Sequence, residues 1–456
     1  MTLMLSLSWI CIMLLLGVFL RAKVKFFRNI LMPASVIGGI VGFICINAGV
    51  LWNADFSVYN QITTELFILS FIALGLTGIG DSSGESGASL FKTIIKGSIG
   101  ISCIWCGLWA ITPLIGYGVG YLMSGFTDMH PVYNLLIPTA FCDGPGQALI
   151  FGNMFESYGW KNASQVGVIF AVIGFFYAFG VGVPMAKLGI KRGIAKHVEK
   201  IDDCVATGLF KQNDTRESLG EETTYSGNID TLALHLALMG VCYILSILFS
   251  KLLALIPGTL GTTLSSFTFM WGLIMAYVVR WLLKKMNLLQ YTNDILFTRI
   301  TGTCTDFLIV SAFMAVQISL IISWLIPILI VTAISALVTF IACFYFGSRL
   351  GSDHDFERTL GIFGTATGTT PTGIALIRIV DPNLRTPAAT EIGAMNVCAI
   401  PLASIVYVAI PSMAQLIAEG SSAMIPVVAC LATLVACFVL LKIFRVWGKP
   451  TFRLRK

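Results

Sequence analysis

The chain has 456 residues, of which 56% are hydrophobic and only 11% are charged, and its formal net charge is +6. Soluble domains carry about 25% charged residues, so this composition excludes a soluble protein with a single anchor and indicates a polytopic membrane protein. The basic residues lie at the ends of apolar stretches, which is a topological pattern and not a nucleic-acid-binding surface.

Apolar stretches long enough to cross a bilayer recur along the whole chain, because a spanning helix needs about 20 such residues. We expect eleven spanning helices, over 3–20, 32–51, 64–80, 94–123, 163–187, 231–256, 264–283, 303–322, 324–347, 387–414 and 421–444. No basic residue precedes the first stretch and no clear small-residue cleavage site follows it. We therefore interpret it as a retained helix and not as a signal peptide.

Two further apolar segments, 134–158 and 357–382, are interrupted by glycine, proline and small polar residues. The first contains the run Asp143-Gly144-Pro145-Gly146-Gln147, and the second contains five threonines between 364 and 373. Lipid cannot satisfy the backbone groups that such a break exposes, so the break must line a cavity enclosed by protein. A matched pair of broken segments, one in each half, is typical of a transporter's binding site. We expect each to be re-entrant or unwound.

The distribution of lysine and arginine predicts the orientation of the chain in the membrane. With the N-terminus outside, only Lys161 and Lys251 of the 29 basic residues fall on the outer side. The basic C-terminal tail and the polar stretch 188–228 are then cytoplasmic. This predicts a multi-pass protein of the plasma (inner) membrane with a cytoplasmic C-terminus.

The two halves of the chain resemble each other. Residues 64–70 (TELFILS) match 305–311 (TDFLIVS), and 163–167 (ASQVG) match 389–393 (ATEIG) in the same order. Five spans per half is an odd number, so the two repeats must have inverted topology. The predicted fold is all-α, with two inverted repeats of five transmembrane helices and one extra C-terminal helix. The predicted domains are a first repeat, a cytoplasmic linker, a second repeat, and the extra helix with its basic tail, over 1–187, 188–228, 229–416 and 417–456.

Several motifs give the chain a family resemblance over roughly 20–415. They are the stretches 143–148 (DGPGQA), 158–160 (YGW), 162–166 (NASQV), 368–375 (GTTPTGIA) and 33–39 (PASVIGG). On these residues the chain resembles the bacterial glutamate:sodium symporters. The resemblance implies a secondary active transporter that couples sodium to the import of glutamate or similar acidic substrates. It also implies a homodimer with a fixed scaffold and a moving transport unit, and therefore elevator-like alternating access.

The chemistry of the broken segments fits such a carrier. Sodium prefers oxygen ligands, which unwound carbonyls, hydroxyls and carboxylates supply, while a helix N-terminus attracts a carboxylate. The candidate sodium ligands are Asp143, Thr365, Thr367, Gly368 and Glu391. The candidate substrate-binding residues are Asp143, Gly144, Gly146, Gln147, Thr369, Thr370, Thr372, Gly373 and Arg378. We expect no cofactor, no enzymatic activity and no metal other than sodium.

Each candidate also has a structural interpretation. Asp143 could cap a helix near the outer surface, a single threonine could merely satisfy the backbone of a helix break, and Arg378 could snorkel to the cytoplasmic surface. Two alternative functions also stay open. One is a cation-coupled carrier of another carboxylate, such as a dicarboxylate or hydroxy acid. The other is a channel, since re-entrant loops also form selectivity filters.

Overall fold

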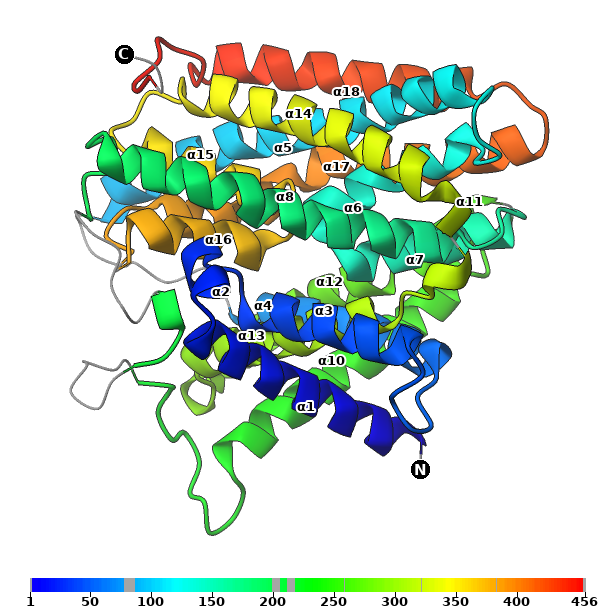
Figure 1. The fold of residues 1–456 in the computed structure, drawn as a ribbon. Helices are drawn as coiled ribbons and strands as arrows, with labels where there is room; N and C mark the ends of the chain where they lie inside the picture. Colours follow the sequence, from blue (N-terminus) through cyan, green and yellow to red (C-terminus); the bar gives the residue numbers. More distant parts are fainter. Residues whose placement is uncertain are drawn as a thin grey trace. The chain divides into compact units, whose positions relative to one another are not determined.

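The structure is a computed structural model that describes residues 2–77, 87–198, 206–210, 218–257, 259–320, 322–382 and 384–453. The secondary structure of these residues is helical, without a strand (Figure 1). Among them, nine helices are long and apolar enough to cross a membrane. They are α1 (Thr2–Lys23), α4 (Phe56–Thr77), α5 (Gly87–Met123), α8 (Ala163–Lys191), α10 (Thr231–Leu253), α13 (Asp294–Met314), α14 (Leu325–Gly347), α17 (Ala388–Ala418) and α18 (Met424–Ile443).

The remaining two predicted spans form helices that are shorter. The stretch 32–51 contains α3 (Ala34–Asn47), which has 14 residues and ends before Gly49, whose φ is +69°. At 1.5 Å per residue α3 is about 21 Å long, less than the roughly 30 Å of a hydrocarbon core. The stretch 264–283 contains α12 (Thr268–Lys285), an 18-residue helix with Lys284 and Lys285 in its last turn.

The chain forms two compact units, and each takes helices from both halves of the sequence. The first unit comprises Met1–Leu16, Gly38–Asp81 and Phe210–Ala315, and the second comprises Gly17–Ile37, Ser82–Leu209 and Val316–Lys456. The predicted repeat boundaries at 187 and 228 therefore do not coincide with unit boundaries. The predicted linker 188–228 includes 199–205 and 211–217, which lie outside the described residues.

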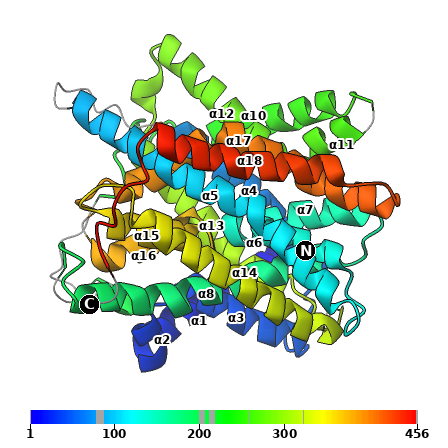
Figure 2. The same cartoon turned by 90° about the horizontal axis from the view of Figure 1, so that it is seen from above.

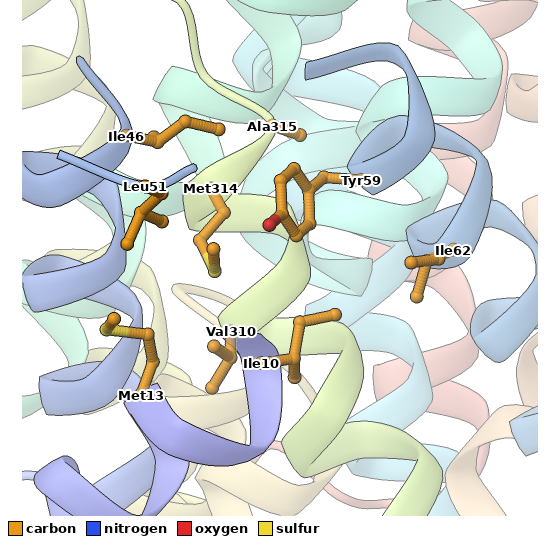
Figure 3. Packing of buried hydrophobic residues seen from close by; sticks show 9 residues of the cluster. All are labelled: Ile10, Met13, Ile46, Leu51, Tyr59, Ile62, Val310, Met314 and Ala315. Atoms are coloured by element: carbon orange, nitrogen blue, oxygen red, sulfur yellow. The ribbon is translucent and has the colours of Figure 1, made fainter. Parts of the chain in front are cut away.

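The first unit is built around α4, which packs against α10, α12 and α13. The Thr63 hydroxyl lies 2.8 Å from the Ser311 hydroxyl, between α4 and α13. A buried apolar cluster joins these helices to α1 and α3 (Figure 3). Its members are Ile10, Met13, Ile46, Leu51, Tyr59, Ile62, Val310, Met314 and Ala315. The short helix α11 (Thr259–Ser266) precedes α12 in the same unit.

The second unit contains both broken segments. Helices α5, α17 and α18 lie side by side in it (Figure 2), while α14 packs against α5. Helix α8 supports the other side of the broken segments, and the short α2 (Lys25–Ile30) contacts α8, where Lys187 Nζ donates to the Asn29 carbonyl at 2.5 Å. The described part of this unit also contains three short 3-10 helices, at Pro131–Leu136 (η1), Ile318–Leu320 (η3) and Ile322–Trp324 (η4). A fourth, Leu289–Tyr291 (η2), lies in the first unit.

The segment after α18 docks onto the second unit. The N–H of Gly448 donates to the Arg349 carbonyl at 2.8 Å, and the N–H of Thr451 donates to the Ser348 carbonyl at the same distance. The ring of Phe452 lies 5.2 Å from that of Phe356. The C-terminal segment is therefore tied to the chain between α14 and the second broken segment.

The eleven cysteines in the described part of the chain are free, and no cluster of His, Cys, Asp and Glu there could hold a metal ion. Most of these cysteines are buried in apolar helices, where cysteine behaves as a small apolar residue.

Candidate functional site

The first broken segment is a pair of helices separated by one glycine. Helix α6 (Ile137–Asp143) ends at Gly144, and α7 (Pro145–Ser157) begins directly after it. Gly144 has φ +81° and ψ −165°, a conformation that is essentially restricted to glycine. Pro145 at the first position of α7 favours a helix start because its missing N–H would have no partner there. The sequence DGPG thus ends one helix and begins another.

The second broken segment has the same organisation. Helix α15 (Asp355–Thr365) ends, residues 366–369 are not helical, and α16 (Thr370–Val380) begins with Pro371 in its first turn. Thr369 caps α16, since its hydroxyl oxygen accepts from the Thr372 N–H at 3.4 Å. All four of these helices pack on α8 (Figure 1).

The two breaks touch each other. A Cβ atom built on Gly144 would lie 2.5 Å from Thr369 Cγ2 and 3.2 Å from the Gly368 carbonyl oxygen. Cys142 Sγ, on the other side of the same break, lies 4.0 Å from the Ala366 carbonyl oxygen. Segments more than 200 residues apart therefore meet where both helices are interrupted.

Helix α8 closes one side of this contact. A Cβ on Gly174 would lie only 2.6 Å from the Thr367 carbonyl oxygen, so glycine allows the break to approach the helix closely. The same Cβ would lie 3.3 Å from a ring carbon of Phe141 in α6. Gly174 was not predicted as a site residue, yet it contacts both broken segments.

The contact brings two helix N-termini together. Helix α7 starts after Gly144 and α16 starts after Thr369, the two residues that meet. The first N–H groups of each helix have no partner within the helix, and the helix dipole makes this end positive. The arrangement therefore favours an anion at the junction.

Asp143 lies at the end of α6, beside the same junction. Its side chain is half-buried, and its Oδ2 atom accepts from the Tyr407 hydroxyl of α17 at 3.0 Å. Within the described residues no lysine, arginine or histidine forms an ion pair with it. A carboxylate in an apolar setting is costly unless a cation or a proton balances it, so Asp143 favours a cation nearby.

Gln147 is fully buried on the first turn of α7. Its carboxamide lies beside the Tyr407 hydroxyl, but neither of its polar atoms forms a hydrogen bond of good geometry to the described residues. Gly146, its neighbour, is also buried in this turn. The predicted residues Asp143, Gly144, Gly146 and Gln147 are thus brought together.

The threonines of the second break have mixed roles. The Thr365 hydroxyl donates to the Gly361 carbonyl at 2.9 Å, and the Thr367 hydroxyl donates to the Phe363 carbonyl at 2.6 Å. These two side chains therefore satisfy their own helix, while their oxygen lone pairs remain available to a cation. The Thr369 and Thr372 hydroxyls lie 3.0 Å apart at the start of α16.

Thr370 is half-buried, and its hydroxyl lies 3.5 Å from Nδ2 of Asn396 on α17. Gly373 lies against α15, because a Cβ on Gly364 would be 2.9 Å from its Cα atom. Gly373 therefore lets α15 and α16 approach each other closely. Gly368, in the non-helical stretch, faces Gly144 through its carbonyl.

Two predicted residues lie away from the junction. Arg378 is exposed on α16, eight residues beyond Thr370, which corresponds to about 12 Å along the helix. Glu391 is fully buried in the first turn of α17, where both of its oxygens pair with Arg358 of α15. The structure does not bring either one together with Asp143 or Thr369.

The Glu391–Arg358 pair belongs to a separate charged cluster. Arg358 Nε donates to Glu391 Oε2 at 2.5 Å, and Arg358 Nη1 lies 3.1 Å from Asp355 Oδ1. Asp355 Oδ2 in turn accepts from the Thr451 hydroxyl of the C-terminal segment at 2.8 Å. Lys96, His354 and Arg358 line a cavity of about 680 Å³ beside this cluster.

Sequence reasoning did not identify the residues that α17 contributes. Tyr407 and Asn396 both lie on this helix, and both contact a predicted site residue. The only signal for Tyr407 was a polar hydroxyl in an apolar helix that also contains Pro401 and Pro411.

Comparisons with known proteins agree on one family. A family model described as "Sodium/glutamate symporter" matches residues 1–385 of the chain. A sodium/glutamate symporter of Haemophilus influenzae is 24% identical over 391 residues, covering 82% of this chain and 88% of that protein. A sodium/glutamate symporter of Escherichia coli is 22% identical over 376 residues, covering 80% of this chain and 86% of that protein.

Proposed function

This chain belongs to the sodium/glutamate symporter family, and on that premise we propose that it is a sodium-coupled symporter that imports glutamate or a related acidic organic anion. The observation that carries the proposal is the contact between Gly144 and Thr369, because it brings the N-termini of α7 and α16 to one point. A carboxylate at this point accepts hydrogen bonds from free backbone N–H groups and is stabilised by two helix dipoles.

The cation binds on the other side of the same junction. Asp143 supplies a carboxylate, and the non-helical residues 366–369 supply carbonyl oxygens with the hydroxyls of Thr365 and Thr367 behind them. These are the oxygen ligands that sodium prefers. Because both ions would bind at the same junction, sodium and the anion attract each other, and this attraction couples their binding.

Transport proceeds by alternating access, and the two halves of the chain are inverted repeats. In support, the counterpart helices α4 and α13 pack against each other through Thr63 and Ser311. The counterpart pairs α3–α13 and α12–α4 both pack through glycine, with Gly39 against Phe313 and Gly272 against Ile72. Such reciprocal packing is expected of repeats related by a two-fold axis, and the inverted topology that we propose would place this axis in the membrane plane.

The second compact unit, which carries both breaks, is the moving transport part, and the first unit is the scaffold of a homodimer. The protein lies in the plasma (inner) membrane with its N-terminus outside and its C-terminus cytoplasmic, as the lysine and arginine distribution predicts. In this orientation the first broken segment enters from outside and the second from inside.

The test is uptake of radiolabelled glutamate by purified protein in liposomes, with an inward sodium gradient or with choline in place of sodium. We expect saturable uptake that depends on the sodium gradient. Uptake that does not depend on sodium would contradict the proposed coupling to sodium, and flux that does not saturate with glutamate would favour a channel. A panel of dicarboxylates and hydroxy acids, tested as competitors, identifies which acid the site prefers.

A further inference from the structure

Tyr407 lies between two polar side chains of the first broken segment. Its hydroxyl donates to Asp143 Oδ2 at 3.0 Å and lies beside the Gln147 carboxamide. These three side chains come from three helices, α6, α7 and α17. The Asp143 carboxylate therefore has one oxygen fixed by α17, while its Oδ1 atom forms no hydrogen bond to the described residues.

The Tyr407 ring is held in place by aromatic contacts. Trp109 of α5 packs edge-on against it, with 4.6 Å between ring centroids, and Phe151 of α7 lies 6.1 Å away. Both neighbouring rings are fully buried. A hydroxyl on so constrained a ring has little freedom, and it keeps the Asp143 carboxylate in one orientation.

The Gln147 carboxamide is the second observation that points to a ligand. It is fully buried and close to Asp143, yet both of its polar atoms lack a hydrogen bond of good geometry to the described residues. A buried amide left in this way destabilises the fold unless something else binds it. An amide oxygen is also a suitable ligand for a hard cation.

We propose that Tyr407 is a positioning residue for the coupling cation: it fixes one oxygen of Asp143 so that the other oxygen, together with the Gln147 carboxamide oxygen, binds sodium. This inference rests on the proposed function, because it takes sodium as the coupling ion. It adds a residue of α17 to the site and reassigns Gln147 from the substrate to the cation.

The test compares Tyr407→Phe with the unchanged protein in two measurements. The first is the sodium concentration for half-maximal glutamate uptake in liposomes. The second is the sodium concentration for half of the sodium-induced rise in thermal unfolding midpoint, measured without glutamate and against choline. Removing one hydrogen bond to a charged group should raise both concentrations about tenfold. The KM for glutamate at saturating sodium should stay within about twofold of the unchanged protein, a split that general misfolding does not produce.

Tyr177→Phe is the matched control. It removes the hydroxyl of a tyrosine in α8 whose ring centroid lies 6.4 Å from that of Phe141 in α6, and it should leave the sodium dependence unchanged. A second variant, Gln147→Met, keeps the side-chain volume but removes both polar atoms, and should also weaken sodium binding. It carries the test if Tyr407→Phe does not fold.

An unchanged sodium dependence in Tyr407→Phe overturns the inference. So does a raised KM for glutamate with unchanged sodium dependence, which would make Tyr407 a substrate-binding residue. The proposed function fails separately. If sodium stabilises the protein through Tyr407 but no glutamate is taken up, the cation site stands and the assigned substrate is wrong. If sodium neither stabilises the protein nor supports uptake, both proposals are wrong.

Discussion

Gly144 is the residue on which the geometry of the first break depends most directly. Its positive φ ends α6 and starts α7, and its missing side chain leaves room for Thr369. No other residue type satisfies both requirements, since an L-residue is strained in this conformation whatever the space around it.

We therefore expect Gly144→Ala to lower the free energy of unfolding by about 2 kcal/mol or more and to abolish uptake, because the added methyl strains the backbone and pushes against Thr369. Thermal unfolding and liposome uptake measure the two effects. Gly180→Ala in α8 is the control, because a Cβ there meets nothing within 4 Å. Transport by Gly144→Ala at the unchanged rate would contradict the role given to the break.

At the level of residues, the sequence was sufficient to place Asp143, Gly144, Gly368 and Thr369 at one candidate site, and the structure brings them together. Glycine and proline within an apolar segment are local signals, so no partner was needed to read them. Tyr407 was not predicted, because its contact with Asp143 joins residues 264 positions apart. Periodicity and composition carry no information about such a pair.

At the level of elements, the buried pair between α15 and α17 has a clear mechanical role. Arg358 binds both oxygens of Glu391 and also Asp355, and all three side chains are at most 3% exposed. The pair therefore fixes the start of the second broken segment against α17. Glu391 was predicted as a sodium ligand, and in the structure Arg358 binds both oxygens of its carboxylate.

We expect Arg358→Met to cost about 3–5 kcal/mol of stability, since it leaves Glu391 buried without a partner. Adding Glu391→Met should recover much of the loss, while Asp355 keeps its bonds to Thr451 and to the N–H groups of Gly351 and Ser352. Thermal unfolding in detergent measures both variants. Arg378→Met, on the exposed face of α16, should change the stability by less than about 0.5 kcal/mol.

The same Arg378→Met variant also tests a sequence prediction. If Arg378 binds substrate, its loss raises the KM for glutamate, whereas a residue that only lies at the surface leaves it unchanged.

For the buried pair, a double variant of Arg358→Met and Glu391→Met no more stable than Arg358→Met alone would contradict the assignment of the lost stability to an unpaired Glu391.

Element positions were more predictable than element lengths. Both breaks fall within the segments that the glycine and proline pattern indicated. The stretch 32–51 was expected to span the membrane, but α3 occupies only Ala34–Asn47 of it. The sequence contains the reason, because Pro33 and Gly49 lie at the two ends of the helix. The expected span was based on hydrophobicity alone, which does not take such helix-ending residues into account.

At the scale of the whole molecule, the proposed mechanism requires the junction to change its access to water during transport. Pro371, at the start of α16, is exposed and lies next to Thr370 and Thr372. A cysteine introduced at Pro371 can therefore report on the access of water to the junction. Gly373 is less suitable for such a cysteine, since it packs against Gly364 without space for a side chain.

We expect a cysteine in Pro371→Cys to react with a small polar maleimide, and sodium with glutamate to change the reaction rate several-fold. Mass spectrometry of the labelled protein gives the rate. The unchanged protein, whose described cysteines are mostly buried, is the control. A rate that neither sodium nor glutamate alters would argue against a shared, gated site.

The membrane class and the family could be predicted from the sequence, because the apolar composition and the short motifs can be recognised without knowledge of the fold. The division into two compact units could not, since each unit combines segments from both halves. The predicted inverted repeat is compatible with such mixing, but only the packing of α4 against α12 and α13 indicates which helices group together.

The two helix N-termini at the junction also bear on how this family varies. Backbone N–H groups are the same for nearly every amino acid, so a point mutation rarely removes them. Under the proposed function, relatives only 22–24% identical to this chain can therefore keep a carboxylate-binding centre while the side chains around it diverge. Divergence then changes which acid fits and which cation accompanies it, and leaves intact the ability to hold an acid at all.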